Sequence, residues 1–179
     1  DNKFKLEYSQ ILDQDRGSGY WIWKYKIIQS LLNEIKDGDI IVYCDAGASL
    51  NYYAKKRFTE YIELLKDSNF SSLRMQCEEQ FKEKQFTTKE LFNYFNIGIE
   101  SDIATSTQLQ AGHMFFKKNK DSLNYFMEYE ELLKKDRKLI TDYYSSFEQT
   151  AEFIENRHDQ SIFSLMSKKF GAEIIKNET

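Results

Sequence analysis

The sequence of 179 residues contains no proline, two cysteines and two histidines. The missing proline, beside abundant Lys, Asn, Ile, Phe and Tyr, reflects compositional bias and says nothing about chemistry. Cys44 and Cys77 are too few for a disulfide framework and lack the paired spacing of a zinc site, so a reducing cytoplasm fits best. Nothing in the sequence places His113 or His158 beside either cysteine, which leaves a cysteine–histidine nucleophile unsupported. The P-loop and HExxH patterns are also absent, which argues against those enzyme classes.

Long apolar runs are missing as well. No run reaches the ~20 residues needed to cross a bilayer, and the first ten residues have neither the basic start nor the apolar stretch of a signal peptide. We therefore expect no transmembrane segment and no export. The net charge of −4, with basic residues dispersed among acidic ones, argues against a nucleic-acid partner. Without a linker or repeat, residues 1–179 are expected to form one domain, and the start at Asp1 suggests processing or a fragment.

Hydrophobic periodicity predicts alternating helices and strands. Thr87 and Glu90 are spaced as a capping box for one of the helices. The continuous apolar run at 39–44 is typical of a strand buried on both faces. Helices are expected at 23–35, 52–65, 91–95 and 123–133 and from Asp159 onward, and strands at 39–44, 73–77, 109–116 and 172–175. The predicted class is α/β, with a largely parallel or mixed sheet.

The first candidate site follows the strand at 39–44. Asp45 would lie at the carboxyl end of that strand, where ligands of α/β sheets bind, and Ala46 and Gly47 leave room for a ligand to approach the backbone. The alternative is an ordinary turn, because Asp and Gly are common turn residues.

A second candidate is the glycine-containing segment 17–24, which leads into a predicted helix and holds both tryptophans. Trp21 and Trp23 could stack on a base or sugar, and Lys24 could pair with a diphosphate. The alternative is that both tryptophans fill the core, since large aromatic residues are usually buried.

A third candidate is the pair Ala111 and Gly112, inside the predicted strand at 109–116. Small residues in a strand often mark the close approach of a ligand, but a β-bulge explains them equally well.

The fourth candidate is the polar segment 156–161 at a predicted helix start. His158 and Asp159 could ligate a divalent metal ion, and a helix N-terminus favours anions such as a diphosphate. The alternative is that Asp159 only caps the helix.

Four segments, taken in order, resemble a family of nucleotide-diphospho-sugar transferases found in polysaccharide and lipopolysaccharide gene sets: GSGYWIWK, DGDIIVYCDAG, LQAGHMFF and RHDQSIFSLMSKKFG. The resemblance spans residues 16–171. It implies the GT-A fold, a Rossmann-like mixed sheet flanked by helices. Little before Arg16 could supply the strand that holds the nucleobase in such folds, so the chain is expected to lack it at its N-terminus.

The resemblance also implies a site. Asp159 and Gln160 are implied as the catalytic residues, facing the reacting carbon or the acceptor hydroxyl. Asp45 and His158 are implied to hold Mn²⁺ or Mg²⁺, although Gly47 stands where a DxD motif has its second acid. The residues implied to bind the nucleotide and the donor sugar are Gly19, Tyr20, Trp21, Trp23, Lys24, Asp45, Ala46, Gly47, Ala111, Gly112 and Arg157.

The function implied is glycosyl transfer from a nucleoside diphosphate sugar to a hydroxyl of a glycan or glycolipid acceptor, with peripheral membrane association allowed. Two rival interpretations remain. One is a non-catalytic nucleotide-sugar-binding domain derived from such a transferase. The other is a structural α/β interaction module in which Asp159 caps its helix and the tryptophans pack.

Overall fold

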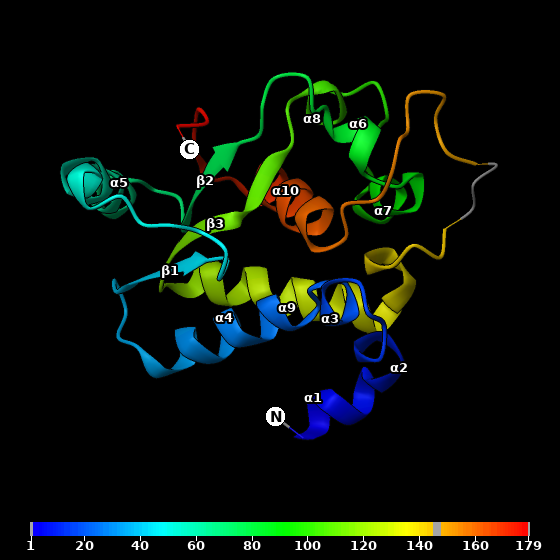
Figure 1. Ribbon diagram of the computed structural model, residues 1–179, viewed down its shortest axis with the longest axis horizontal. Helices are drawn as coiled ribbons and strands as arrows, with labels where there is room; N and C mark the ends of the chain where they lie inside the picture. Colours follow the sequence, from blue (N-terminus) through cyan, green and yellow to red (C-terminus); the bar gives the residue numbers. More distant parts are fainter. Residues whose placement is uncertain (1, 145–147, 179) are drawn as a thin grey trace.

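A four-stranded mixed sheet lies at the centre of the computed structural model, which describes residues 2–144 and 148–178 (Figure 1). The strands are β1 (Ile40–Cys44), β2 (Ser72–Gln76), β3 (Leu109–Lys117) and β4 (Glu173–Ile175), in the order β1-β3-β2-β4. β3 runs antiparallel to both β1 and β2, and β2 pairs with β4 in parallel. The mixed α/β class is confirmed. The largely parallel alternative is wrong, because a strand's own hydrophobic pattern does not encode the direction of its neighbour.

Helices cover both faces of this sheet. Figure 1 shows α4 and α9 side by side, with α10 against β3 and α5 on the opposite side of the sheet. The described helices are α1 (Asn2–Glu7), α2 (Ser9–Leu12), α3 (Gly17–Tyr20), α4 (Trp23–Glu34), α5 (Lys55–Asp67), α6 (Glu83–Phe86), α7 (Lys89–Phe95), α8 (Asp102–Thr105), α9 (Lys120–Lys135) and α10 (Asp159–Phe170), with 3-10 turns η1 (Tyr52–Ala54) and η2 (Arg137–Ile140). The predicted helix starts at Trp23 and Asp159 are confirmed. Residues 2–12 form helices α1 and α2.

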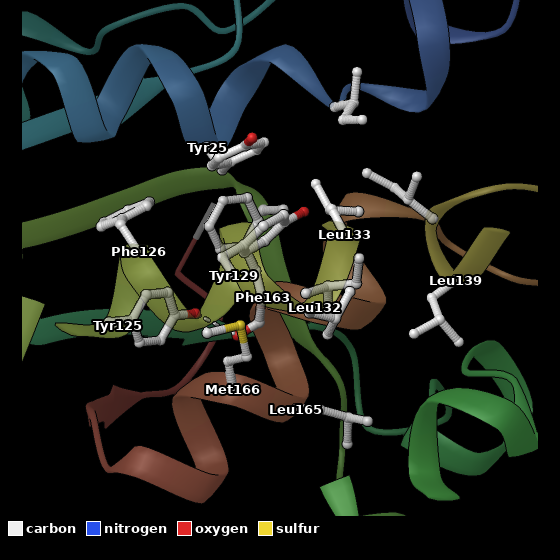
Figure 2. Close-up of a cluster of buried hydrophobic side chains, with 14 of the residues drawn as sticks. Tyr25, Tyr125, Phe126, Tyr129, Leu132, Leu133, Leu139, Phe163, Leu165 and Met166 are labelled. Carbon is white, nitrogen blue, oxygen red and sulfur yellow. Dashed lines mark hydrogen bonds between the residues drawn. The ribbon is translucent and has the colours of Figure 1, made fainter. Parts of the chain in front are cut away.

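An aromatic cluster joins α4, α9 and α10 in the main core (Figure 2). Tyr25 of α4 stacks on Tyr129 of α9 with ring centroids 4.8 Å apart, and Tyr129 contacts Phe163 of α10 at 4.8 Å. The Tyr125 hydroxyl donates a hydrogen bond of 3.0 Å to the Phe163 carbonyl. Burying each such ring stabilises the fold by about 1.5–3 kcal/mol. The cluster therefore fixes the starts of α4 and α10 relative to each other, because Tyr25 and Phe163 lie within about one turn of those starts.

Two local predictions need correction. The residues of β1 are all half-buried, not buried on both faces, because β1 lies at an edge of the described sheet. The cap of α7 is Thr88, whose side chain accepts a hydrogen bond from the Leu91 amide, and not Thr87. Thr87 instead donates to the buried carboxylate of Glu83 at 2.8 Å. A hydrogen bond to a residue four positions earlier, whose carboxylate is held in place by α10, thus decided between two adjacent threonines.

The pairing of β3 with β2 has a register shift next to Ala111 and Gly112, where a β-bulge was one of the two interpretations. β3 itself is continuous, but Arg74 pairs with Met114 while Gln76 pairs with Leu109. The residues of β3 around Ala111 and Gly112 therefore leave the ladder with β2. The Arg74 guanidinium donates to the Gln110 carbonyl at 2.6 Å, which satisfies a backbone group next to the break.

Candidate functional site

A pocket of about 200 Å³ opens where the starts of α4 and α10 meet the end of β1 and the first half of β3. Four segments that are distant in the sequence converge here. The residues lining it are Arg16, Trp21, Lys24, Asp45, Ala111, Gly112, Arg157, His158, Asp159 and Gln160. All of these except Arg16 were predicted as site residues from the sequence. The structure therefore brings most of the predicted set to one place.

Lys24 is the centre of this pocket. It is buried, with 3% of its surface exposed, at the second position of α4. Its ammonium lies 3.1 Å from Asp45 Oδ1 and 3.0 Å from Asp159 Oδ2, and donates to the Ala111 carbonyl at 3.4 Å. The buried ammonium therefore has two acidic partners and a carbonyl around it, as a charge inside a protein requires.

Asp159 is the buried carboxylate of the pocket and the first residue of α10. Burial raises the pKa of this carboxyl to about 6, although Lys24 acts in the opposite direction. Oδ2 has ion-pair contact with the Lys24 ammonium but no aligned hydrogen bond. Asp159 thus stands at a helix N-terminus, where negative charge is favoured, with one oxygen incompletely satisfied.

Asp45 follows the last residue of β1, as the sequence predicted, and its side chain is 46% exposed. The Tyr43 hydroxyl donates to Asp45 Oδ1 at 2.7 Å, and the Asp45 amide donates to the Gly112 carbonyl at 2.9 Å. A Cβ atom on Gly112 would lie 3.2 Å from Asp45 Oδ2. The lack of a side chain at Gly112 therefore gives this carboxylate its room. Ala46 and Gly47 are exposed and do not line the pocket.

Gln160 ties the start of α10 to β3. Its Oε1 accepts from the Ala111 amide at 3.2 Å, and its Nε2 donates to Gln108 Oε1 at 2.8 Å. Both ends of the side-chain amide are therefore used within the protein. Gln108 is fully buried and carried no sequence signal that separated it from an ordinary strand residue.

A left-handed turn at 17–21 shapes the wall formed by Trp21. Gly17, Ser18, Gly19, Tyr20 and Trp21 all have positive φ angles, between 49° and 92°. Left-handed backbone costs roughly 1–2 kcal/mol per non-glycine residue, so the two glycines lower the strain of the turn. Gly19 is also packed so closely that a Cβ atom would lie 2.8 Å from the Ile11 carbonyl oxygen.

The two tryptophans point to different places. Trp21 lines the pocket, with its ring 5.9 Å from the Lys24 ammonium. Trp23 donates its indole N–H to the Gly17 carbonyl at 3.2 Å and lines a separate apolar groove with Phe4 and Ile27. The structure therefore does not bring Trp23 to the site. The alternative of a packing role fits Trp23 better than Trp21.

His158 is buried against the left-handed turn. Its ring stacks on Tyr20 at 4.8 Å, and its Nε2 lies 2.9 Å from Asp142 Oδ1. Burial lowers the pKa of His158, and the Asp142 carboxylate opposes that shift. A neutral imidazole donating Nε2–H to Asp142 satisfies both groups. Asp142 was not predicted as a site residue, because it lies 16 residues before its partner and outside every motif.

Two arginines form the rim of the pocket. The Arg157 guanidinium lies 3.7 Å from the centre of the Phe86 ring, a cation–π contact that orients it. Arg16 lies 3.7 Å from Asp142 and 3.6 Å from Glu155, and about half of its side chain is exposed. Arg16 was missed by the sequence reasoning, since a single arginine before a glycine-rich turn carries no pattern.

The side chains at the pocket do not fit a divalent metal ion well. Asp45 and His158 were implied as ligands, but a ring nitrogen of His158 is used by Asp142, and Asp45 faces the Lys24 ammonium. Within residues 2–144 and 148–178, no three His, Cys, Asp or Glu side chains group as a metal site. The Lys24 ammonium already lies against both carboxylates, where a divalent ion would have to bind.

Cys44 and His113 are opposite each other in the β1–β3 ladder, a proximity that the sequence did not indicate. Burial raises the pKa of the Cys44 thiol, with a further contribution from Asp45. The thiolate is therefore disfavoured, and the pair is not activated as a nucleophile.

Comparisons with other proteins give no further identification. No family model, curated protein or solved structure matches the chain. In the part of the chain that the structure describes, no helix is both long and apolar enough to span a membrane.

Proposed function

We propose that this pocket binds the diphosphate and sugar of a nucleoside diphosphate sugar, and that the protein transfers the glycosyl group to a hydroxyl of a glycan or glycolipid. The observation that carries the proposal is the convergence of Lys24, Asp45, Gly112 and Asp159 on one pocket. These residues come from the four segments on which the family resemblance rests. A structural module would have no need to bring them together.

The cationic groups of the pocket suit a departing diphosphate. Lys24, Arg16 and Arg157 line the same pocket as the first turn of α10, whose backbone N–H groups favour anions. Positive groups that are fixed before reaction stabilise the charge that develops on a leaving group. In this scheme, side chains and a helix terminus neutralise the diphosphate.

Asp159 is the residue proposed to face the reacting centre. A carboxyl with a pKa of about 6 holds and releases a proton near neutral pH. It would accept the proton of the acceptor hydroxyl if the reaction inverts, or stabilise a sugar cation if the reaction retains configuration. Gln160, whose amide is tied to Ala111 and Gln108, is proposed as a positioning residue.

The test is release of nucleoside diphosphate from a panel of nucleotide sugars mixed with glycan acceptors. We expect Asp159→Asn to lower turnover by about 100-fold or more while the donor still binds, as for removal of a general base. Lys66→Ala is the control, because Lys66 forms an exposed ion pair with Glu63 away from the pocket.

The outcomes separate the three interpretations. Release that depends on Asp159 supports the transferase. If a nucleotide sugar binds but no acceptor in the panel leads to release of nucleoside diphosphate, the non-catalytic binding domain would be favoured. No thermal shift with any nucleotide would favour the structural module and would contradict the proposal.

A further inference from the structure

We infer that Lys24 is the resident cation of this site: its ammonium holds the position between Asp45 and Asp159 that a divalent ion would otherwise bridge. The donor is therefore bound without Mn²⁺ or Mg²⁺, and removing the lysine side chain creates a divalent-cation site. The statement about the donor rests on the proposed function. The role of Lys24 as the cation between Asp45 and Asp159 rests only on the contacts of these side chains.

The ammonium contacts oxygens of three residues, as ion pairs with two carboxylates and a hydrogen bond to a carbonyl. An ammonium has three hydrogens, and three oxygens lie around Nζ, from Asp45 at 3.1 Å, Asp159 at 3.0 Å and Ala111 at 3.4 Å. Two rings add electrostatic support, since the Tyr43 and Trp21 centroids lie 5.2 Å and 5.9 Å from Nζ. Lys24 is thus coordinated on several sides by negative or electron-rich groups.

The lysine is also held in place by its helix. Its neighbour Tyr25 is 1% exposed and Ile28, one turn later, is fully buried, so the start of α4 cannot move away without opening the core. Lys24 itself has 3% of its surface exposed. A metal ion would have to displace this side chain or bind beside it against like-charge repulsion.

The other charged and titratable groups around Lys24 do not offer a substitute ligand set. Arg16 and Arg157 are cationic, and His158 uses one ring nitrogen for Asp142. The Tyr43 hydroxyl already donates to Asp45 Oδ1. If the ammonium is removed, however, Asp45 and Asp159 remain as two carboxylates facing a shared space, which is an arrangement that hard divalent cations favour.

Lys168 provides a matched control, because it is the partner of another buried carboxylate, Glu83. Lys168 contacts the one carboxylate of Glu83, which also accepts hydrogen bonds from Thr87, Gln108 and Ser164. Removing Lys168 therefore leaves one carboxylate with several donors, and no cation site should result.

The probe is Mn²⁺ alone, with the free ion measured by electron paramagnetic resonance during titration of the protein. We expect wild type and Lys168→Ala to show no Mn²⁺ binding that depends on Asp45. Lys24→Ala should gain one site at least about tenfold tighter than any in wild type. The double variant Lys24→Ala/Asp45→Asn should lose that site. Circular dichroism and thermal melting check that each variant is folded.

In the Mn²⁺ titration, two results would overturn the inference: a wild-type site that Asp45→Asn removes, or a folded Lys24→Ala that gains none. If Lys24→Ala does not fold, Lys24→Gln replaces it, and the comparison of wild type with Asp45→Asn still decides. Binding of nucleotide sugars is measured separately, with and without EDTA. Equal binding in both supports the inference, and binding abolished by EDTA contradicts it. If none binds in either condition, the proposed function fails while the Mn²⁺ titration still judges the role of Lys24.

Discussion

Two lysines of this protein, with side chains 4% and 7% exposed, have different surroundings. Lys168 meets the single carboxylate of Glu83, which is fully buried and whose two oxygens also accept from Thr87, Gln108 and Ser164. Lys24 meets two carboxylates, of which Asp45 is half-exposed and Asp159 has an oxygen without an aligned hydrogen bond. The first cluster is neutral and complete. The second has an excess of acid and opens into a pocket.

The difference shows how a structural ion pair can be distinguished from a candidate site. A buried pair is tolerated when every polar atom finds a partner within the protein. The Glu83 cluster meets that condition and joins α6, α10 and Gln108, the residue before β3. The Lys24 cluster does not meet it, so its polar groups remain available to a ligand, and the pocket beside it gives that ligand space. The two clusters differ in whether every polar atom has a hydrogen-bond partner, and not in the burial of their lysines.

The largest expected effect is a loss of stability when the Glu83 cluster is broken. Glu83→Ala leaves Lys168 buried without its carboxylate and should lower the free energy of unfolding by about 3–5 kcal/mol, measured by urea denaturation. The control Glu63→Ala breaks an exposed pair with Lys66 and should cost less than about 1 kcal/mol. Equal losses in the two variants would contradict a structural role for Glu83.

The next largest effect is the pH dependence of the free energy of unfolding that Asp159 contributes. Burial raises the pKa of Asp159 from its ordinary value of 3.8 to about 6. Between these values the native chain keeps a proton that the unfolded chain has lost. The contribution of Asp159 to the free energy of unfolding is therefore greatest below pH 3.8 and falls by about 3 kcal/mol as the pH rises through 6.

Urea denaturation of wild type and Asp159→Asn at pH 4.5 and 7.5 measures this contribution. The stability of wild type relative to the variant should be greater at the lower pH. His158 titrates with the opposite sign because its pKa is lowered, but it is present in both proteins. If the difference in free energy of unfolding between wild type and Asp159→Asn does not change with pH, burial does not hold Asp159 in its protonated form.

A smaller effect is expected at the turn that forms the pocket wall. Gly19→Ala places a side chain at φ 92° and a Cβ atom 2.8 Å from the backbone of Ile11 and Leu12, which should cost roughly 2 kcal/mol. Gly47→Ala is the control, since a Cβ there meets nothing within 4 Å and should change stability by less than about 0.5 kcal/mol. Thermal melting distinguishes the two. If Gly19→Ala melts at the same temperature as wild type, the turn accommodates the added side chain without strain, which would contradict this prediction.

The smallest effect on stability is expected for Asp45→Asn. Because this side chain is 46% exposed, losing its pair with Lys24 should cost less than about 1 kcal/mol. The same variant should weaken donor binding, measured by calorimetry, if Asp45 contacts the nucleotide. A loss of stability as large as that of Glu83→Ala would remove the contrast between the two clusters.

Most elements could be predicted from the sequence because their signals are local. The periodic apolar face of α4, the β-branched run of β1 and the start of α10 at Asp159 were all recovered within about one residue. The errors occurred where a neighbour decided the outcome. Glu83 engages Thr87 and leaves Thr88 to cap α7, and the edge position of β1 leaves it half-buried. Glu83 lies only four residues before Thr87, but its burial against α10, like the edge position of β1, is not visible in the local pattern.

The sequence by itself determined the four strands and the longer helices, but not the short helices α1, α2, α6 and α8. It also determined the residue types at the pocket: a lysine after the glycine-rich turn, an acid after β1, small residues in β3 and an acid at the start of α10. Only the tertiary structure decided that Lys24 lies between Asp45 and Asp159, that Asp142 holds His158 and that Trp23 turns away. Local propensity depends on neighbours along the chain, whereas ion pairs and burial depend on packing between segments that the sequence separates by many residues.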